Sequence, residues 1–284
     1  MRLLPNDNPV YVFKGEDEMV KIIELKTIED ILPLYTQQEY REDLDRNRSW
    51  YLYRGMTNTK FDLTTSLDRN CKQHKAELET SILMNFTKYG ALEDPTIERS
   101  VWRQMFMGQH YGLPTRLLDW SQSPLVALHF ATCENNLDKM DAHDCMIWRI
   151  DMKEIHSLLP EKYKSELASH KTTVFTVNML NDVVPSLKQY DADMSDKSMV
   201  VIEPPSIDPR IVNQYSFFSI VPNGIENLAD FLDKYTEKTI KYIIPKELRW
   251  RIRDMLDQQN VSERMFFPGL DGLSKWLGRH YFVK

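Results

Sequence analysis

The chain has 284 residues, of which 42% are hydrophobic, 27% charged and 11% aromatic. This composition is typical of a globular protein with room for a large core, and it excludes disordered, collagen-like and low-complexity proteins. The formal net charge of −6 gives no global electrostatic signal for nucleic-acid binding, so a nucleic-acid site in this chain would have to be a local basic groove.

The N-terminus and the cysteines give an expectation for location. The sequence becomes polar by position six, and nowhere do about eighteen apolar residues follow one another. Cys71, Cys133 and Cys145 form no C-x-x-C pair, so neither a disulfide framework nor a cysteine zinc site is expected. We therefore predict a protein that is neither exported nor bound to a membrane and that resides in the cytoplasm.

The first part of the chain is predicted to be mainly helical. Residues 18–45 carry apolar side chains at helical spacing, and we assign 1–46 to an N-terminal helical extension. An aromatic and branched run then stops at Gly55, which predicts a strand with the charged Arg54 at its exit. The predicted elements in this part are the strand at 50–55 and two core-packing helices at 71–89 and 96–111.

Strands become frequent after residue 112. Predicted strands lie within 112–121 and at 145–150, 199–202, 216–221 and 240–244, with helices at 123–132, 157–169, 226–235, 246–259 and 270–281. The strands cluster after several helices instead of alternating with them, which favours an α+β fold over a doubly wound parallel sheet. Because no repeat and no Gly/Ser linker divides the chain, we predict a single mixed domain.

Several common enzyme motifs are absent. The sequence has no P-loop, no G-x-G-x-x-G, no H-E-x-x-H and no G-x-S-x-G. A glycine-rich phosphate cradle, a helical zinc pair and the usual hydrolase elbow are therefore not expected. The residues left to carry chemistry are arginines, aromatic rings and uncharged polar groups.

The most distinctive stretch runs from Gln109 to Ser121 and has the sequence QHYGLPTRLLDWS. Together with Tyr53-Arg54-Gly55 it resembles the FRG domain family, named after Phe-Arg-Gly at the first motif; here Tyr53 replaces the phenylalanine. Further similar segments are Ser123–Leu125, Arg210–Gln214 with Phe217 or Phe218, and Phe267–Leu273. The resemblance covers about residues 47–280, so we assign 47–284 to an FRG domain.

The order of these motifs also resembles, more distantly, the ADP-ribosyltransferase fold. That fold has a first strand ending in Arg-Gly, a second ending in small hydroxyls before an apolar helix, and a third carrying an acid or amide. The resemblance implies a central short-stranded sheet surrounded by helices, with NAD as the bound nucleotide. It implies Arg54 as the NAD anchor, Ser121 as the second-motif hydroxyl and Gln214 as the third-motif residue, where those enzymes have Glu.

Breaking the nicotinamide bond of NAD passes through an oxocarbenium-like state, so the site must hold the pyrophosphate, stack the ring and present a base. The candidates for binding are Arg54, Gly55, Tyr53, Arg116, Ser121, Trp120 and Tyr111. The candidates for catalysis are Gln214, Glu203, Asp119 and His110. An amide cannot stabilise positive charge as a carboxylate does, so Asp119 or Glu203 is the candidate replacement for the missing glutamate.

These residues also have structural interpretations. Arg54 could pair with Asp119, which would then be a structural acid, and His110 could be a satisfied core or capping group. Ser121 suits a turn or cap. The basic stretch 241–253, which includes aromatic rings, could follow single-stranded nucleic acid, although a solvated helix face is the simpler interpretation.

The resemblance implies an NAD-dependent ADP-ribosyltransferase, the toxin of a bacterial anti-phage toxin-antitoxin module, that modifies a base in single-stranded RNA. An antitoxin protein would be its partner. One alternative is transfer to protein side chains. The other is a non-catalytic module that binds a nucleotide or a protein, and the Gln at position 214 is the feature that favours it.

Overall fold

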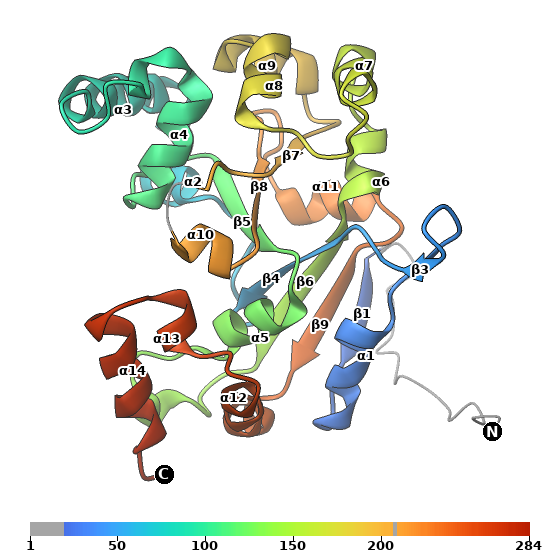
Figure 1. Cartoon of the computed structure of the whole chain (residues 1–284), viewed down its shortest axis with the longest axis vertical. Coiled ribbons are helices and arrows are strands. Elements are labelled where there is room, and N and C mark those ends of the chain that lie inside the picture. Colours follow the sequence, from blue (N-terminus) through green and yellow to red (C-terminus); the bar gives the residue numbers. More distant parts are fainter. Residues whose placement is uncertain (1–19, 207–208) are drawn as a thin grey trace.

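A mixed sheet of seven strands forms the centre of the fold. The computed structural model describes residues 20–206 and 209–284. The strands pair in the order β1-β9-β6-β4-β5-β8-β7, with β1 parallel to β9 and all other neighbours antiparallel (Figure 1). They are β1 (Lys21–Glu24), β4 (Tyr51–Met56), β5 (Leu117–Ser121), β6 (Cys145–Asp151), β7 (Val200–Ile202), β8 (Ser216–Ile220) and β9 (Ile240–Ile244). A separate two-stranded ribbon consists of β2 (Tyr40–Arg41) and β3 (Arg46–Asn47).

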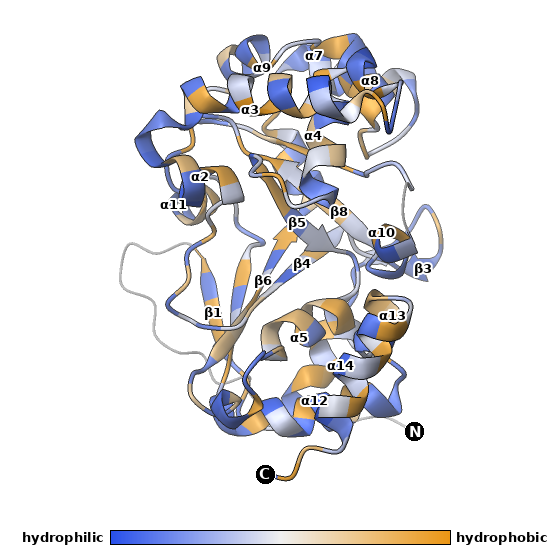
Figure 2. Cartoon of the chain, turned by 90° about the vertical axis from the view of Figure 1, so that its left-hand side faces the viewer, coloured by the Kyte–Doolittle hydropathy of each residue, from blue (hydrophilic) through white to orange (hydrophobic). Residues whose placement is uncertain are grey.

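Helices cover the sheet in two groups, one toward each end of the molecule in both views (Figures 1 and 2). The first group is α3 (Lys75–Gly90), α4 (Val101–His110), α7 (Glu161–Ser169), α8 (Val177–Val183) and α9 (Leu187–Met194). The second is α5 (Pro124–Thr132), α12 (Arg249–Gln258), α13 (Glu263–Phe266) and α14 (Leu270–His280). The remaining helices are α1 (Leu32–Thr36), α2 (Ser66–Cys71), α6 (Met152–Ser157), α10 (Pro209–Asn213) and α11 (Leu228–Tyr235).

The arrangement confirms the predicted α+β class with one mixed sheet. The core forms because alternate strand residues face opposite sides. On β4, Tyr51 and Tyr53 pack with α5 and α12, whereas Leu52 faces the cluster that includes Phe231 of α11. A third cluster joins the first group of helices to strands β7 and β8 through residues such as Phe218 of β8. Within the described residues, no helix has both the length and the apolar character needed to cross a membrane.

The prediction of one or two helices within residues 18–45 is wrong for most of the described part, residues 20–45, which also contains strand β2. Residues 21–24 form a strand, β1, which pairs with β9 more than two hundred positions further along the chain. Only the short helix α1 and a single 3₁₀ turn before it are helical here. Helical spacing over so short a segment does not reveal a distant strand partner, and the β-branched Ile22 and Ile23 suit that pairing. The part of the extension at 1–19 lies outside the described residues, and the domain boundary near 47 stays a prediction.

Helices α8 and α9 were not predicted from the sequence. Each begins at a hydroxyl side chain that accepts a hydrogen bond from the first turn: Thr176 caps α8 and Ser186 caps α9. Both helices are short, at 7 and 8 residues, and they bury only a few side chains. A hydrophobic stripe of that length is too brief to detect by period alone.

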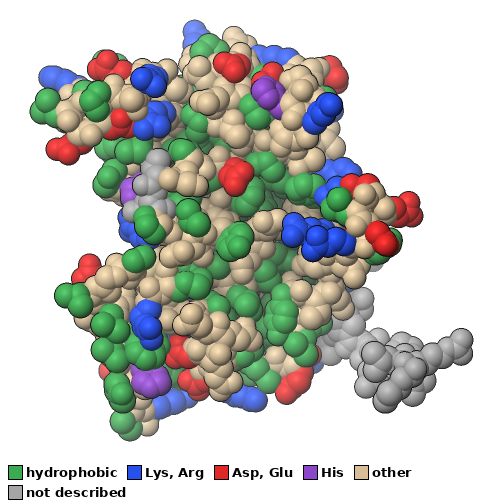
Figure 3. Space-filling model, viewed as in Figure 1, with side chains coloured by type: hydrophobic (Ala, Val, Ile, Leu, Met, Phe, Trp, Pro, Cys, Tyr) green, Lys and Arg blue, Asp and Glu red, His purple; other side chains and the backbone are tan. Residues whose placement is uncertain are grey.

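Apolar side chains also reach the surface on two helices. Figure 3 shows hydrophobic groups over α3 and α14. The exposed ones are Leu78, Met84 and Tyr89 of α3, and Leu270, Leu273 and Leu277 of α14. These side chains leave the two helices with less of their apolar surface buried than the helices packed on the sheet.

Gly55 of β4 lies directly beneath helix α5. A Cβ atom at this position would lie 1.9 Å from the carbonyl oxygen of Ala127 and 2.5 Å from the backbone nitrogen of Ala131. Both are backbone atoms of α5, so neither can turn aside. The glycine of the Arg-Gly pair is therefore required for the helix to pack against the strand.

Gly55→Ala is expected to lower the free energy of unfolding by about 3 kcal/mol or more, because the new methyl group overlaps helix backbone. Chemical denaturation followed by circular dichroism measures this. The matched control is Gly278→Ala in α14, where an added Cβ meets nothing within 4 Å, and where the better helix propensity of alanine should stabilise the protein slightly. Equal stability of the two variants would contradict the proposed packing constraint.

His156 of α6 is buried and ties that helix to the edge of the sheet. Its Nε2 accepts a hydrogen bond from the backbone nitrogen of Val201 at 3.0 Å, so the ring proton is assigned to Nδ1, which donates to the carbonyl oxygen of Thr173 at 2.9 Å. Burial lowers the pKa of His156 to about 4. The folded protein therefore keeps this imidazole neutral at pH values where an unfolded chain would protonate it.

The stability contributed by His156 should fall as the pH drops from about 6.5 to about 4, because only the unfolded chain binds a proton in that window. The slope is at most about 1.4 kcal/mol per pH unit for one group. Urea denaturation of the wild type and of His156→Gln at several pH values tests this. The stability difference between them should shrink toward pH 4, and a difference that is constant with pH would argue against it.

Candidate functional site

A cavity with polar and apolar lining opens where β4 and β5 separate. These strands pair at one position only, Tyr53 with Ser121. Beyond it lies a cavity of about 810 Å³, within the usual range for small-molecule sites. Arg54, Ser121 and Gln214, the three residues singled out by their order in the sequence, all line it. Asp119, Trp120 and Gly55 line it too.

Arg54 spans the gap between the two strands. Its Nη1 donates to the carbonyl oxygen of Asp119 at 2.7 Å, taking the place of a strand hydrogen bond, and lies 3.7 Å from the Asp119 carboxylate. Its Nε is buried and has no hydrogen-bond partner among the described residues. Burial lowers the pKa of Arg54 and the Asp119 charge opposes that shift, but an arginine pKa starts so high that the group stays charged. A charged, incompletely satisfied guanidinium is suited to an anionic ligand.

Two further cations line the same cavity. Lys60 lies between β4 and α2, and Arg69 lies on α2, where its Nη1 donates to the carbonyl oxygen of Thr64 at 2.6 Å. Phe61, an exposed aromatic ring, lies beside Lys60 in the same lining. None of the three was predicted from the sequence, because they belong to no motif and only their position soon after Arg54 could have indicated them. With Arg54 the two cations exceed by one the carboxylates Asp62 and Asp119 of the same lining, so the cavity keeps a net positive charge.

The side chain of Gln109 orients the Asp119 carboxylate. Gln109 Nε2 donates to Asp119 Oδ2 at 3.1 Å, and Gln109 Oε1 accepts from Thr115 Oγ1 at 2.6 Å. The Asp119 side chain is nevertheless 54% exposed. It therefore remains an oriented, solvent-accessible carboxylate as well as a partner of Arg54.

Ser121 connects β5 to the turn that carries Gln214. Its Oγ donates to the Gln214 carbonyl oxygen at 2.6 Å and accepts from the Ser123 backbone nitrogen at 3.0 Å. The next residue, Tyr215, has a positive φ of 47°, which is strained for a side chain of this size. The Gln214 amide itself forms no side-chain hydrogen bond with the described residues. The hydroxyl thus fixes the backbone, and the amide stays available to a ligand.

A family model for the FRG domain matches residues 49–140. The chain contains an FRG domain. No curated protein and no solved structure gave a significant match to the chain. The matched segment of the FRG domain supplies Arg54, Asp119 and Ser121 to the cavity, whereas Gln214 comes from outside it.

Most of the aromatic residues predicted to stack on a ring belong to the lining of this cavity. Tyr53 is buried and its hydroxyl donates to the Leu34 carbonyl oxygen at 3.1 Å. Trp120 is buried and its Nε1 donates to Ser219 Oγ at 3.0 Å. Both line the cavity while their polar groups are engaged elsewhere. Further rings in the lining are Phe61, Phe130 and Phe267.

Arg116 was predicted to bind the nucleotide, and the structure contradicts this. It lies at the opposite end of β5 from Ser121, buried between Glu79 and Asp191, and lines none of the cavities described. Its Nε donates to Glu79 at 2.7 Å and its Nη1 to Asp191 at 2.5 Å. Burial by itself would lower the pKa of Arg116, but the bonds and charges of Glu79 and Asp191 outweigh it and raise the pKa. The guanidinium is fully used in an internal ion cluster.

Three other predicted residues lie outside the main cavity. Glu203 is exposed after β7 and faces two different cavities, because the chain leaves the sheet edge there. Tyr111 is 70% exposed just after α4 and does not line the cavity. His110 faces a smaller cavity that adjoins the main one. The basic stretch at 241–253 also does not form a continuous exposed surface for nucleic acid, because Arg249 and Arg253 are buried.

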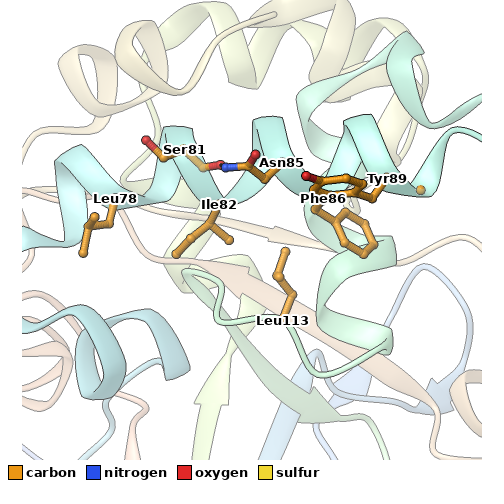
Figure 4. A pocket seen from close by; sticks show the side chains of 8 residues that line it. Leu78, Ser81, Ile82, Asn85, Phe86, Tyr89 and Leu113 are labelled. Atoms are coloured by element: carbon orange, nitrogen blue, oxygen red, sulfur yellow. The ribbon is translucent and has the colours of Figure 1, made fainter.

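A second large cavity, of about 640 Å³, lies beside α3 (Figure 4). It is lined mainly by apolar side chains, among them Leu78, Ile82, Phe86 and Leu113. Among the residues that the structure describes, no carboxylate, histidine or cation lines it. Within the described residues no group of three His, Cys, Asp or Glu could hold a metal ion. The cavity between β4 and β5 is therefore the candidate site for chemistry.

Proposed function

We propose that this protein is an NAD-dependent ADP-ribosyltransferase that uses the cavity between β4 and β5. The observation that carries the proposal is that Arg54, Ser121 and Gln214, far apart in the sequence, line one cavity together with the Asp119 carboxylate. Their order along the chain is the one that the resemblance to ADP-ribosyltransferases implies.

The lining suits NAD as the substrate. Arg54, with its unpartnered Nε, would hold the pyrophosphate, and Lys60 and Arg69 would add charge. The aromatic rings, among them Trp120 and Phe61, give the cavity flat surfaces for the nicotinamide and adenine rings. The amide of Gln214 would donate to or accept from a ribose hydroxyl.

The reaction makes one demand on charge. The bond between ribose C1′ and the nicotinamide nitrogen breaks, its electron pair leaves with nicotinamide, and C1′ bonds to the acceptor, which gives up a proton. Gln214 cannot offset the positive charge that develops on the ribose. Asp119 supplies a carboxylate that lines the same cavity, held by Gln109, and would take both the charge-stabilising role and the proton.

For the acceptor we propose a base in single-stranded RNA, and for the biological setting a bacterial anti-phage module whose antitoxin restrains the enzyme. The cations Arg54, Lys60 and Arg69 outnumber the carboxylates Asp62 and Asp119 in the cavity lining, so the cavity has a local positive charge despite the net charge of −6. A non-catalytic nucleotide-binding module is the second candidate, because an amide stands at position 214 in place of the expected acid.

The test uses the purified full chain, NAD labelled in the adenylate part, and either total RNA or cell lysate protein. We expect label in RNA and release of nicotinamide, both lost in Arg54→Ala and kept in Arg251→Ala, an exposed arginine of α12. Label in protein alone would overturn the choice of acceptor. Binding of NAD without nicotinamide release would support the non-catalytic module, and no binding of NAD at all would rule out transfer to RNA and transfer to protein alike.

A further inference from the structure

A small second cavity adjoins the proposed NAD site. It has a volume of about 140 Å³ and shares Asp119, Gln214 and Ser216 with the larger cavity. These three residues therefore form a common wall between the two. Gln109, which holds the Asp119 carboxylate, also lines the small cavity.

The small cavity combines apolar walls with a polar pair. Phe106, Phe218 and two prolines supply the apolar surface. Arg210 of α10 and His110 of α4 meet there, with Arg210 Nη2 3.2 Å from His110 Nε2. Because a guanidinium only donates, the imidazole nitrogen facing it accepts, which assigns a ring proton on Nδ1. The cavity is thus ring-sized, with both apolar and polar walls and an arginine at its side.

Size and charge together indicate the occupant. A cavity of about 150 Å³ is large enough for benzene, so one of 140 Å³ has room for a single planar ring, and the amides of Gln109 and Gln214 beside Phe106 and Phe218 suit a ring with polar edges. The cation beside it matches the phosphate that accompanies each base of a nucleic acid. A flexible single strand can present such a base, because its bases are free to leave the stack.

We propose that the small cavity is the acceptor site and binds one base of a single-stranded nucleic acid, with Arg210 on the neighbouring phosphate. This inference rests on the proposed function. A nitrogen of the base forms the new bond to ribose C1′, the bond from C1′ to nicotinamide breaks with its electrons leaving on nicotinamide, and the proton of the base passes to the Asp119 carboxylate. Asp119 suits this role because it lines both cavities.

Because the donor and the acceptor occupy separate cavities in this proposal, cleavage of NAD and transfer to the acceptor can be measured separately. Water can take the place of the acceptor, so nicotinamide release without RNA reports on the large cavity alone. A change confined to the small cavity should therefore lower the ratio of label transferred to nicotinamide released. A change at Arg54 should lower both quantities together.

The experiment compares Arg210→Glu and Ile211→Trp, which reverse the charge and fill the small cavity, with the surface charge reversal Arg251→Glu. Each is incubated with labelled NAD and a defined single-stranded RNA oligonucleotide. We expect the ratio of transfer to release to fall at least tenfold in the first two variants and to stay at the wild-type value in Arg251→Glu. An unchanged ratio in both small-cavity variants would overturn the proposal.

Binding of a fluorescent oligonucleotide, followed by anisotropy without NAD, keeps this inference separate from the proposed function. If the wild type releases no nicotinamide, the proposed function fails, and the anisotropy alone decides: weaker binding in Arg210→Glu supports the nucleic-acid site, and equal binding contradicts it. If the wild type instead labels lysate protein and Ile211→Trp abolishes that label, the cavity serves a protein side chain and the nucleic-acid assignment is wrong.

Discussion

Arg54→Ala is expected to lower nicotinamide release about 100-fold or more. The variant removes the guanidinium whose buried Nε has no partner among the described residues, and with it a charge-assisted contact worth about 1.5–3 kcal/mol at each phosphate oxygen. It also removes the bond that joins β4 to the Asp119 carbonyl oxygen across the gap. Steady-state release of nicotinamide from NAD measures the effect, with kcat and KM determined separately.

Arg54→Lys separates charge from geometry. Lysine keeps the positive charge and three N–H donors, but all three belong to one nitrogen, so it lacks the planar fork with which Arg54 bonds the Asp119 carbonyl oxygen through Nη1 and presents separate nitrogens to a ligand. We expect an intermediate loss of about tenfold, mainly in KM. Arg251→Ala controls for loss of an arginine from the surface, and thermal melting checks that each variant is folded. Full activity in folded Arg54→Ala would remove Arg54 from the site.

The convergence of the three motifs was predictable because each motif sits at the end of a locally encoded element. Arg54 lies two residues before the end of β4, Ser121 ends β5 before an apolar helix, and Gln214 lies two residues before β8. Local pattern therefore predicted where each side chain leaves the sheet. The pairing order β4-β5-β8 then brings the three together.

What the sequence did not reveal depends on partners distant along the chain. The β1 strand needs β9, and neither pattern contains the other. Lys60 lies in the irregular segment after β4, which has no periodicity to interpret, and that segment also positions α2, which carries Arg69, beside the cavity. Glu203 has the residue type that the chemistry needs, yet the chain carries it away from the cavity at the sheet edge. Residue type and neighbouring motif predict a role only when the topology supplies the contact.

Arg116 is the clearest example, and its correction leads to a strong prediction. It occurs in the most distinctive motif of the chain, but its partners Glu79 and Asp191 lie 37 and 75 positions away. Arg116→Met is expected to lower the free energy of unfolding by about 3–5 kcal/mol, because it leaves the buried carboxylate of Glu79 without its counter-charge. The midpoint of urea denaturation measures this loss. Asp191 is less affected, since Asn223 also donates to it.

The double variant Arg116→Met/Glu79→Met distinguishes a structural role from a binding role. Replacing both partners by apolar groups removes the unpaired charge, so we expect most of the lost stability to return. Since Arg116 does not line the cavity, NAD binding by the refolded double variant should match the wild type in isothermal titration calorimetry. If stability returns while NAD affinity stays at least tenfold weaker, Arg116 contributes to the site after all. If both the stability and the NAD affinity return, Arg116 has a structural role and joins α3 and α9 to the start of β5. Nucleotide binding then depends on Arg54 and not on Arg116.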